Sequence, residues 1–154
     1  MEIKYIYATE ADIQTLVDQR VIFSDELVGK QDALKELEFR KLSHDYFKEE
    51  LNKNYLCWYA EIDGKVAAIA GLVIRRNPGN MKNPSGYWGY LMNVYTAPEH
   101  RKKGLSLAIL DKLIASGRER GITAFELHAT KDGEPVYIKN GFQLHNEPTY
   151  RKHF

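Results

Sequence analysis

The strongest constraint on the fold lies between Tyr87 and Gly121, where a strand pattern changes into a helix pattern across a short basic turn. Aromatic and branched residues dominate the first part of this stretch, which predicts a strand. Pro98 ends that strand. Apolar residues then recur at helical spacing, which predicts a helix, at Leu105, Ala108, Ile109, Leu113 and Ile114. The chain is therefore expected to build its fold around a strand, a turn and a helix.

The turn before this helix has the composition of an anion-binding site. Arg101, Lys102 and Lys103 directly precede Gly104. The first backbone N–H groups of a helix have no partner within the helix and lie at the positive end of its dipole. A glycine lets a ligand approach the backbone closely, so we expect this turn to bind phosphate. A run of cations without these two features is more often a solvated turn.

Size, charge and cysteine content limit the class of protein. The chain has 154 residues, a net charge of +1 at pH 7 and one cysteine, Cys57. This length fits one domain over residues 1–154. A near-neutral charge argues against nucleic acid or an acidic membrane as the partner. One cysteine cannot form an internal disulfide, and the polar N-terminus lacks the features of a signal peptide. We therefore expect a cytoplasmic protein.

The remaining elements alternate between strand and helix patterns. Before Tyr87, the sequence predicts a strand at 2–7, a helix after the capping sequence Thr9–Asp12, a helical region at about 31–52, and strands at 55–62 and 65–76. The helical region is either one helix or two helices broken near Ser43. Asp63-Gly64 predicts a tight hairpin between the two strands. After Gly121, we expect a strand at 122–129, a short helix at 133–140 and a last strand region at 142–154.

Two motifs in register carry a resemblance to a known family. The stretch NVYTAPEHRKKGLSLAILDKL, followed by PVYIKNGF, resembles the GNAT superfamily of N-acetyltransferases. The family signature is Arg/Gln-x-x-Gly-x-Gly/Ala, and residues 101–106 fit it with Ser106 at the last small position. A tyrosine four residues before Gly-Phe is the second motif, matched by Tyr137. The resemblance implies an α/β fold with a mixed, mostly antiparallel central sheet flanked by helices, whose fourth and fifth strands splay apart.

The same resemblance implies where acetyl-CoA binds. Its pantetheine arm pairs with the backbone of the fourth strand, and its pyrophosphate lies on the N–H groups of the basic turn. Thr130 stands where many relatives place a coenzyme contact. The implied contacts are Asn93, Val94, Tyr95, Thr96, Arg101, Lys102, Lys103, Gly104, Leu105, Ser106 and Thr130. The histidines lack metal-ligand spacing, so we expect no metal.

The implied reaction is direct transfer of the acetyl group to a primary amine of a small molecule or peptide. A protonated alkylamine, with a pKa of about 10, has no free electron pair and must first lose a proton. Backbone N–H groups near Val94 and Tyr95 would polarise the thioester carbonyl. Tyr137 is the family-matched donor of a proton to the leaving thiolate. Without the register of the two motifs, Tyr137 would be interpreted as an ordinary packing residue.

The general base is less clearly marked. Many relatives carry a carboxylate on the fourth strand, but residues 87–95 contain none. Glu126 and His128 are two residues apart on the next predicted strand, so their side chains share one face. We expect His128 to act as the base if that face opens to the cleft. Water as the base and a purely structural histidine remain the alternatives.

The acceptor and two other classes of function stay open. Acceptor contacts are expected at 23–30, which includes Asp25 and Glu26, and in the loop 76–86. The missing strand carboxylate favours a non-catalytic acyl-CoA-binding sensor as the alternative to an enzyme. A nucleic-acid-binding domain would use the cations Arg75, Arg76, Lys82 and 101–103. Relatives also suggest a possible homodimer that pairs through the C-terminal strand.

Overall fold

A five-stranded sheet forms the centre of the molecule. The structure is a computed structural model that describes all residues from Met1 to Phe154. The strands lie in the order of the chain and comprise β1 (Ile3–Tyr7), β2 (Tyr55–Ile62), β3 (Lys65–Arg76), β4 (Tyr87–Thr96) and β5 (Phe125–Glu126). Neighbouring strands are antiparallel except β4 and β5, which are parallel. The mixed, mostly antiparallel sheet predicted above is confirmed.

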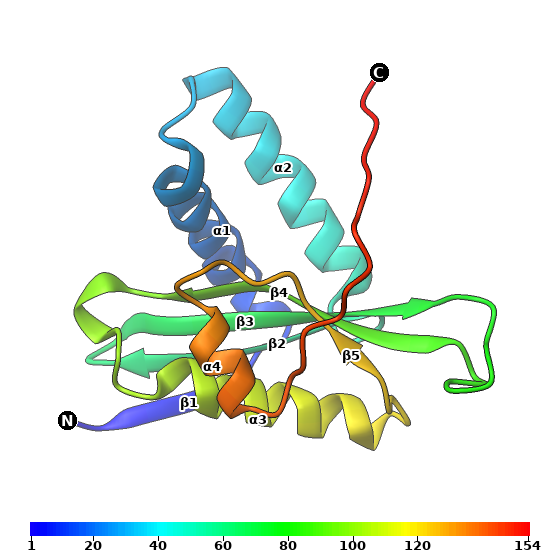
Figure 1. Cartoon of the computed structure of the whole chain (residues 1–154). Coiled ribbons are helices and arrows are strands. Elements are labelled where there is room, and N and C mark those ends of the chain that lie inside the picture. Colours follow the sequence, from blue (N-terminus) through cyan, green and yellow to red (C-terminus); the bar gives the residue numbers. More distant parts are fainter.

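Helices cover both faces of this sheet (Figure 1). The hairpin of α1 (Ile13–Val28) and α2 (Ala33–Glu50) lies on one face, and α3 (Leu105–Glu119) lies on the other. The short α4 (Glu134–Lys139) contacts α3. Single 3-10 turns, Glu10–Asp12 and Pro98–His100, precede α1 and α3. None of the helices has the length and apolar composition needed to cross a membrane.

Two apolar clusters hold the helices to the sheet, one on each face. Alternate residues of a strand point to opposite faces, so neighbouring residues of one strand enter different clusters. The α3 cluster includes Leu56, Leu72 and Leu91 of the sheet with Ile109, Leu110 and Leu113. The α1–α2 cluster includes Tyr55, Cys57, Ile69 and Tyr95 of the sheet with Leu16, Val17 and Phe47. Of the apolar positions predicted on α3, Leu105, Ile109 and Leu113 lie in the α3 cluster, and Ile114 packs against it.

Local signals in the sequence located several elements correctly. Asp63 and Gly64 have φ values of 51° and 75°, as a tight hairpin turn requires. Thr9 donates its backbone N–H to the Asp12 carboxylate at 2.8 Å, which confirms the capping sequence. The region after Gly29 forms one helix that continues through the buried Ser43. The single-helix alternative is therefore correct.

Two predictions near the C-terminal end were wrong. The strand expected at 122–129 is limited to Phe125–Glu126, because β4 turns away from it beyond Tyr90. Residues 142–154 form no strand. A strand needs a neighbour to pair with its N–H and C=O groups, and within one chain this segment has none, leaving Leu144 and Tyr150 exposed. Pairing of two chains through this segment stays a prediction.

Gly71 tests the packing between β2 and β3. A Cβ atom at this position would lie 1.8 Å from Oη of Tyr55, whose side chain is fully buried. We expect Gly71→Ala to lower the free energy of unfolding by about 1–3 kcal/mol, because the buried ring has no space to move into. Urea denaturation measures this change. An unaltered unfolding midpoint would contradict the described packing of Tyr55 over Gly71.

Candidate active site

The site begins where β4 loses its neighbour. β5 pairs with β4 only at Gly89 and Tyr90, and no other strand lies on that side of β4. Backbone groups on this edge of residues 91–96 therefore have no strand partner. An unpaired strand edge can bind an extended ligand through main-chain hydrogen bonds. The predicted splaying of the fourth and fifth strands is confirmed.

A β-bulge bends β4 at the same place. Met92 lies opposite Gly71 and Tyr95 lies opposite Ile69, so β4 carries one extra residue relative to β3. Asn93 in this bulge has a φ of 54°, a left-handed conformation that asparagine tolerates better than most residues. Its side chain donates a hydrogen bond of 3.2 Å to Oη of Tyr55. A bulge increases the local bend and twist of a strand, which explains why β4 diverges from β5 here.

The basic turn presents a run of free backbone donors. None of the N–H groups of residues 102–107 donates a hydrogen bond within the chain. Lys102 and Gly104 have φ values of 61° and 80°. Successive N–H groups in such a turn form a concave site for anions. A Cβ atom on Gly104 would meet no atom within 4 Å, so the space in front of the turn is open to a ligand.

Two sets of contacts hold this turn in place. Leu105 is buried in the α3 cluster. Oγ of Ser106 lies 2.6 Å from Oγ1 of Thr96, so one hydroxyl donates to the other. The serine at the last small position of the motif thus fixes the first turn of α3 to the strand. The orientation of the free N–H groups is set by these contacts and needs no ligand.

Arg101 ties the basic turn to α1 through its side chain. Its guanidinium donates to the backbone oxygen of Thr96 at 2.9 Å and to the carboxylate of Glu26. Hydrogen bonds from Arg101 and Tyr95 hold the pKa of Glu26 below its ordinary value. Glu26, predicted as an acceptor contact, is therefore engaged within the chain. The guanidinium of Arg101 is engaged in the same way, whereas Lys102 and Lys103 form no ion pair.

Tyr137 lies on α4 beside the α3 cluster. Its ring centroid is 6.4 Å from that of Phe142. Burial raises the pKa of Tyr137 above its usual value, so the phenol is protonated at neutral pH. Its hydroxyl shares the space in front of Gly133 with Thr130, because a Cβ atom on Gly133 would lie 3.3 Å from Oγ1 of Thr130 and from Oη of Tyr137. Thr130 accepts a hydrogen bond from the N–H of Gly133 at 3.2 Å.

His128 is exposed and follows β5. The ring of Tyr90 lies 5.6 Å away, in an edge-on arrangement. Cζ of Arg75 lies 3.9 Å from the centre of the same Tyr90 ring, and a guanidinium nitrogen of Arg75 is 3.7 Å from the Glu126 carboxylate. Glu126 and His128 thus share a face next to the open edge of β4. No group of three or more histidine, cysteine or acidic side chains in the chain could hold a metal ion.

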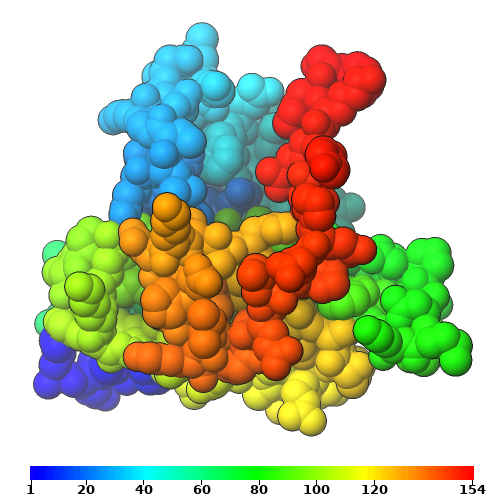
Figure 2. Space-filling model, viewed as in Figure 1, coloured from blue at the N-terminus to red at the C-terminus, as the bar shows by residue number.

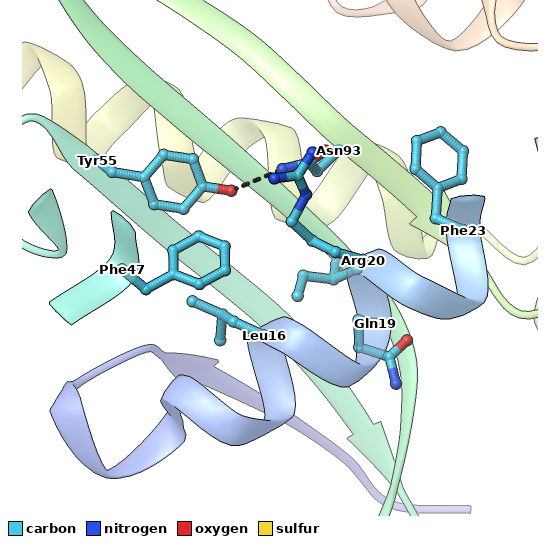
Figure 3. A pocket seen from close by; sticks show the side chains of 8 residues that line it. Leu16, Gln19, Arg20, Phe23, Phe47, Tyr55 and Asn93 are labelled. Carbon is cyan, nitrogen blue, oxygen red and sulfur yellow. Dashed lines mark hydrogen bonds between the residues drawn. The ribbon is translucent and has the colours of Figure 1, made fainter. Parts of the chain in front are cut away.

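Two cavities lie near the helical hairpin. The larger, about 300 Å³, is lined only by α1, α2 and their connection. The smaller, about 10 Å³, reaches the bulge of β4 and is lined by Leu16, Gln19, Arg20, Phe23, Phe47, Tyr55, Ile69 and Asn93 (Figure 3). In the space-filling view, a hollow opens between this hairpin and the C-terminal segment (Figure 2). Only the smaller cavity contacts the strand that carries the open edge.

Comparison with known proteins agrees with this geometry. The model of the acetyltransferase (GNAT) family matches residues 22–142. The chain belongs to the GNAT acetyltransferase family. A search of curated protein sequences gave no match.

Solved structures extend the likeness over almost the whole GNAT chain. A predicted acetyltransferase from Clostridium acetobutylicum, crystallised with acetyl-CoA, is 29% identical with a TM-score of 0.83, over 98% of this chain and 96% of that one. A GCN5-related N-acetyltransferase from Ralstonia eutropha JMP134 is 26% identical with a TM-score of 0.81, over 98% and 99%. Glucosamine-6-phosphate N-acetyltransferase from Arabidopsis thaliana shares the fold at 15% identity, with a TM-score of 0.72 over 100% and 99%.

Sequence analysis of this GNAT domain missed the side chains of the smaller cavity. Arg20 and Tyr55 were not singled out, and Asn93 was expected to act only through its backbone. Two signals were present in the sequence. Arg20 lies on the helix between Leu16 and Phe23, residues that otherwise form an apolar stripe, and Asn93 interrupts a strand of aromatic and branched residues. A polar residue within an apolar pattern often marks a site.

The left-handed turn of the GNAT domain is tested by two substitutions at Gly104. At a φ of 80° with open space around the missing Cβ, Gly104→Ala meets no clash but adopts an unfavourable backbone conformation. We expect it to lower the free energy of unfolding by about 1–2 kcal/mol. Gly104→Asn should cost less, since asparagine tolerates this region. Thermal unfolding measures both, and equal stability of the alanine variant and the wild type would contradict the assigned conformation.

Proposed function

We propose that the protein transfers an acetyl group from acetyl-CoA to a primary amine by direct attack of the amine on the thioester. The observation that carries this proposal is the run of free N–H groups at 102–107 beside the open edge of β4. A coenzyme with a diphosphate and an extended, amide-containing arm needs both features together. The crystallised relative from Clostridium acetobutylicum, described as containing acetyl-CoA, supports the same ligand.

The residues proposed to hold the coenzyme act mostly through the backbone. Residues 102–106 donate N–H groups to the diphosphate, and Lys102 and Lys103 add positive charge that no carboxylate of the chain neutralises. Asn93 to Thr96 offer main-chain groups to the pantetheine arm. The backbone N–H of Arg101 donates to the oxygen of Pro98, so Arg101 keeps the turn in place through its side-chain contacts with Thr96 and Glu26. Thr130 lies at the other side of the proposed site, near Tyr137.

The proposed chemistry exchanges one bond for another. The amine nitrogen forms a bond to the acetyl carbon, and the bond between that carbon and the coenzyme sulfur breaks. N–H groups near Val94 and Tyr95 stabilise the charge that develops on the carbonyl oxygen. Tyr137 donates a proton to the sulfur, a role that its protonated state at neutral pH suits. The proton of the amine goes to His128 or to water.

The family assignment favours acetyl transfer over the alternative, a non-catalytic acyl-CoA-binding module. A thiol-release assay with acetyl-CoA and a panel of amines tests the proposal, because an enzyme liberates coenzyme A only when an acceptor is present. Calorimetric titration with acetyl-CoA tests binding separately. Tight binding without amine-dependent thiol release would identify the binding module, and absence of both would refute the proposed function.

The basic turn is tested by Gly104→Glu. A glutamate at this position fills the open space in front of the turn and places a negative charge beside the diphosphate. We expect the Kd for acetyl-CoA to rise by about tenfold or more, since one unfavourable charge contact costs more than about 1 kcal/mol. Gly104→Gln is the matched control, because it has the size and the backbone strain of the glutamate without the charge. If Gly104→Glu stays folded and binds as tightly as wild type, the turn is not the diphosphate site.

The proton donor is tested by Tyr137→Phe. Loss of the hydroxyl should lower kcat by about 10²–10⁴-fold, the usual contribution of a positioned acid, and leave the Kd for acetyl-CoA nearly unchanged. Steady-state kinetics and calorimetry measure the two effects. Phe142→Leu controls for damage to the ring packing around Tyr137. An equal loss of binding and turnover in Tyr137→Phe would indicate a structural role instead.

A further inference from the structure

Arg20 is a cation in largely apolar surroundings. It is half-buried on α1 and lines the smaller cavity together with the apolar side chains of Leu16, Phe23, Phe47 and Ile69 (Figure 3). Its Cζ atom lies 5.0 Å from the centre of the Phe39 ring on α2. Removing a charge from water is costly unless a partner compensates for it. The position of Arg20 therefore calls for a partner.

Beyond the Phe39 ring, the chain supplies no anionic or hydrogen-bonding partner for Arg20. Arg20 forms no ion pair and no hydrogen bond, whereas Arg40 on the facing helix binds two carboxylates, Asp18 at 2.8 Å and Glu36 at 3.1 Å. These acids of the helical hairpin are thus already neutralised by Arg40. The positive charge of Arg20 is close enough to Tyr55 to oppose the rise in the pKa of Tyr55 that burial causes.

The donors that converge on the smaller cavity lack an acceptor. Oη of Tyr55 accepts a hydrogen bond from Asn93, so its own O–H hydrogen is free to donate. The guanidinium of Arg20 contributes further N–H donors and cannot accept. The cavity volume of about 10 Å³ is close to the space that one water-sized atom occupies. A carboxylate only accepts hydrogen bonds, so one of its oxygens suits these donors. The same oxygen fits the volume of the cavity.

The position of the smaller cavity links it to the amine substrate that accepts the acetyl group. Asn93 lies on the stretch of β4 proposed to run beside the thioester, and its side chain turns to the face covered by α1 and α2. A group bound there belongs to the molecule that approaches the thioester from this face. We propose that Arg20, with the hydroxyl of Tyr55, binds a carboxylate of the acceptor, so that the substrate is an amine that also carries a carboxylate. This inference rests on the proposed acetyl transfer.

Pairs of amines that differ only in the carboxylate provide the test. Lysine is compared with cadaverine, tyrosine with tyramine and histidine with histamine, each as acceptor in the thiol-release assay. For pairs that are turned over, we expect a higher kcat/KM with the carboxylate by about 10- to 100-fold, the range of a charge-assisted hydrogen bond. Phosphoethanolamine compared with ethanolamine tests whether phosphate is the preferred anion instead.

Variants assign the preference to Arg20. Arg20→Gln should abolish the preference for the carboxylated member, mainly through a higher KM, while acetyl-CoA binding stays unchanged. Arg20→Lys should retain part of the preference, since lysine keeps the positive charge but cannot form the bidentate hydrogen bonds of a guanidinium. Lys41→Gln on α2 is the matched control, because it removes one exposed positive charge that forms no ion pair. It should leave the preference intact.

Binding measurements separate this inference from the proposed function. Calorimetry with the same pairs, on protein saturated with coenzyme A, needs no turnover. Weaker binding of the carboxylated member to Arg20→Gln than to wild type would support the inference even if no acceptor is acetylated. Acetylation of amines without any preference for a carboxylate would overturn the inference and leave the proposed function standing. A preference that survives in Arg20→Gln, or one for phosphate alone, would also overturn it.

Discussion

The loss of pairing between β4 and β5 beyond Tyr90 is the constraint on which the site depends. A central strand normally has its N–H and C=O groups paired on both sides. Here, an extra residue at Asn93 bends β4 away, and the side-chain hydrogen bond from Asn93 to Tyr55 holds the bend. Gly71 makes this possible because it leaves room for the ring of Tyr55. Packing on the α1–α2 face thus determines what the open edge of β4 can bind.

The head of α3 completes the same site from the other face. The helix is fixed by its apolar cluster and by the hydroxyl pair of Thr96 and Ser106. These contacts leave the N–H groups of 102–107 free rather than satisfied by the chain. Such preorganised donors need little rearrangement when an anion binds, which lowers the cost of binding. Arg101 and Glu26 connect this region to the end of α1, next to the proposed acceptor side.

The sequence predicted what depends on local patterns. Helical spacing located α3, the Asp63-Gly64 pair located a hairpin, and two motifs in register identified the family. Prediction from the sequence failed where the interacting residues are far apart in the chain. The length of β5 depends on a bulge in β4, and the segment 142–154 has a strand pattern but no neighbouring strand. The engagement of Glu26 by Arg101, 75 residues further along the chain, could not be read from either segment alone.

The cavity at Asn93 was hidden for the same reason, since Arg20, Tyr55 and Asn93 come from three separate elements. We propose above all that the free amides at the head of α3 bind the coenzyme diphosphate. The most direct measurement is a titration of ¹⁵N-labelled protein with acetyl-CoA, followed through its backbone amide resonances. We expect the largest shifts on residues 102–107, with further shifts along 93–96. Saturable binding that leaves the amides of 102–107 unshifted would contradict it.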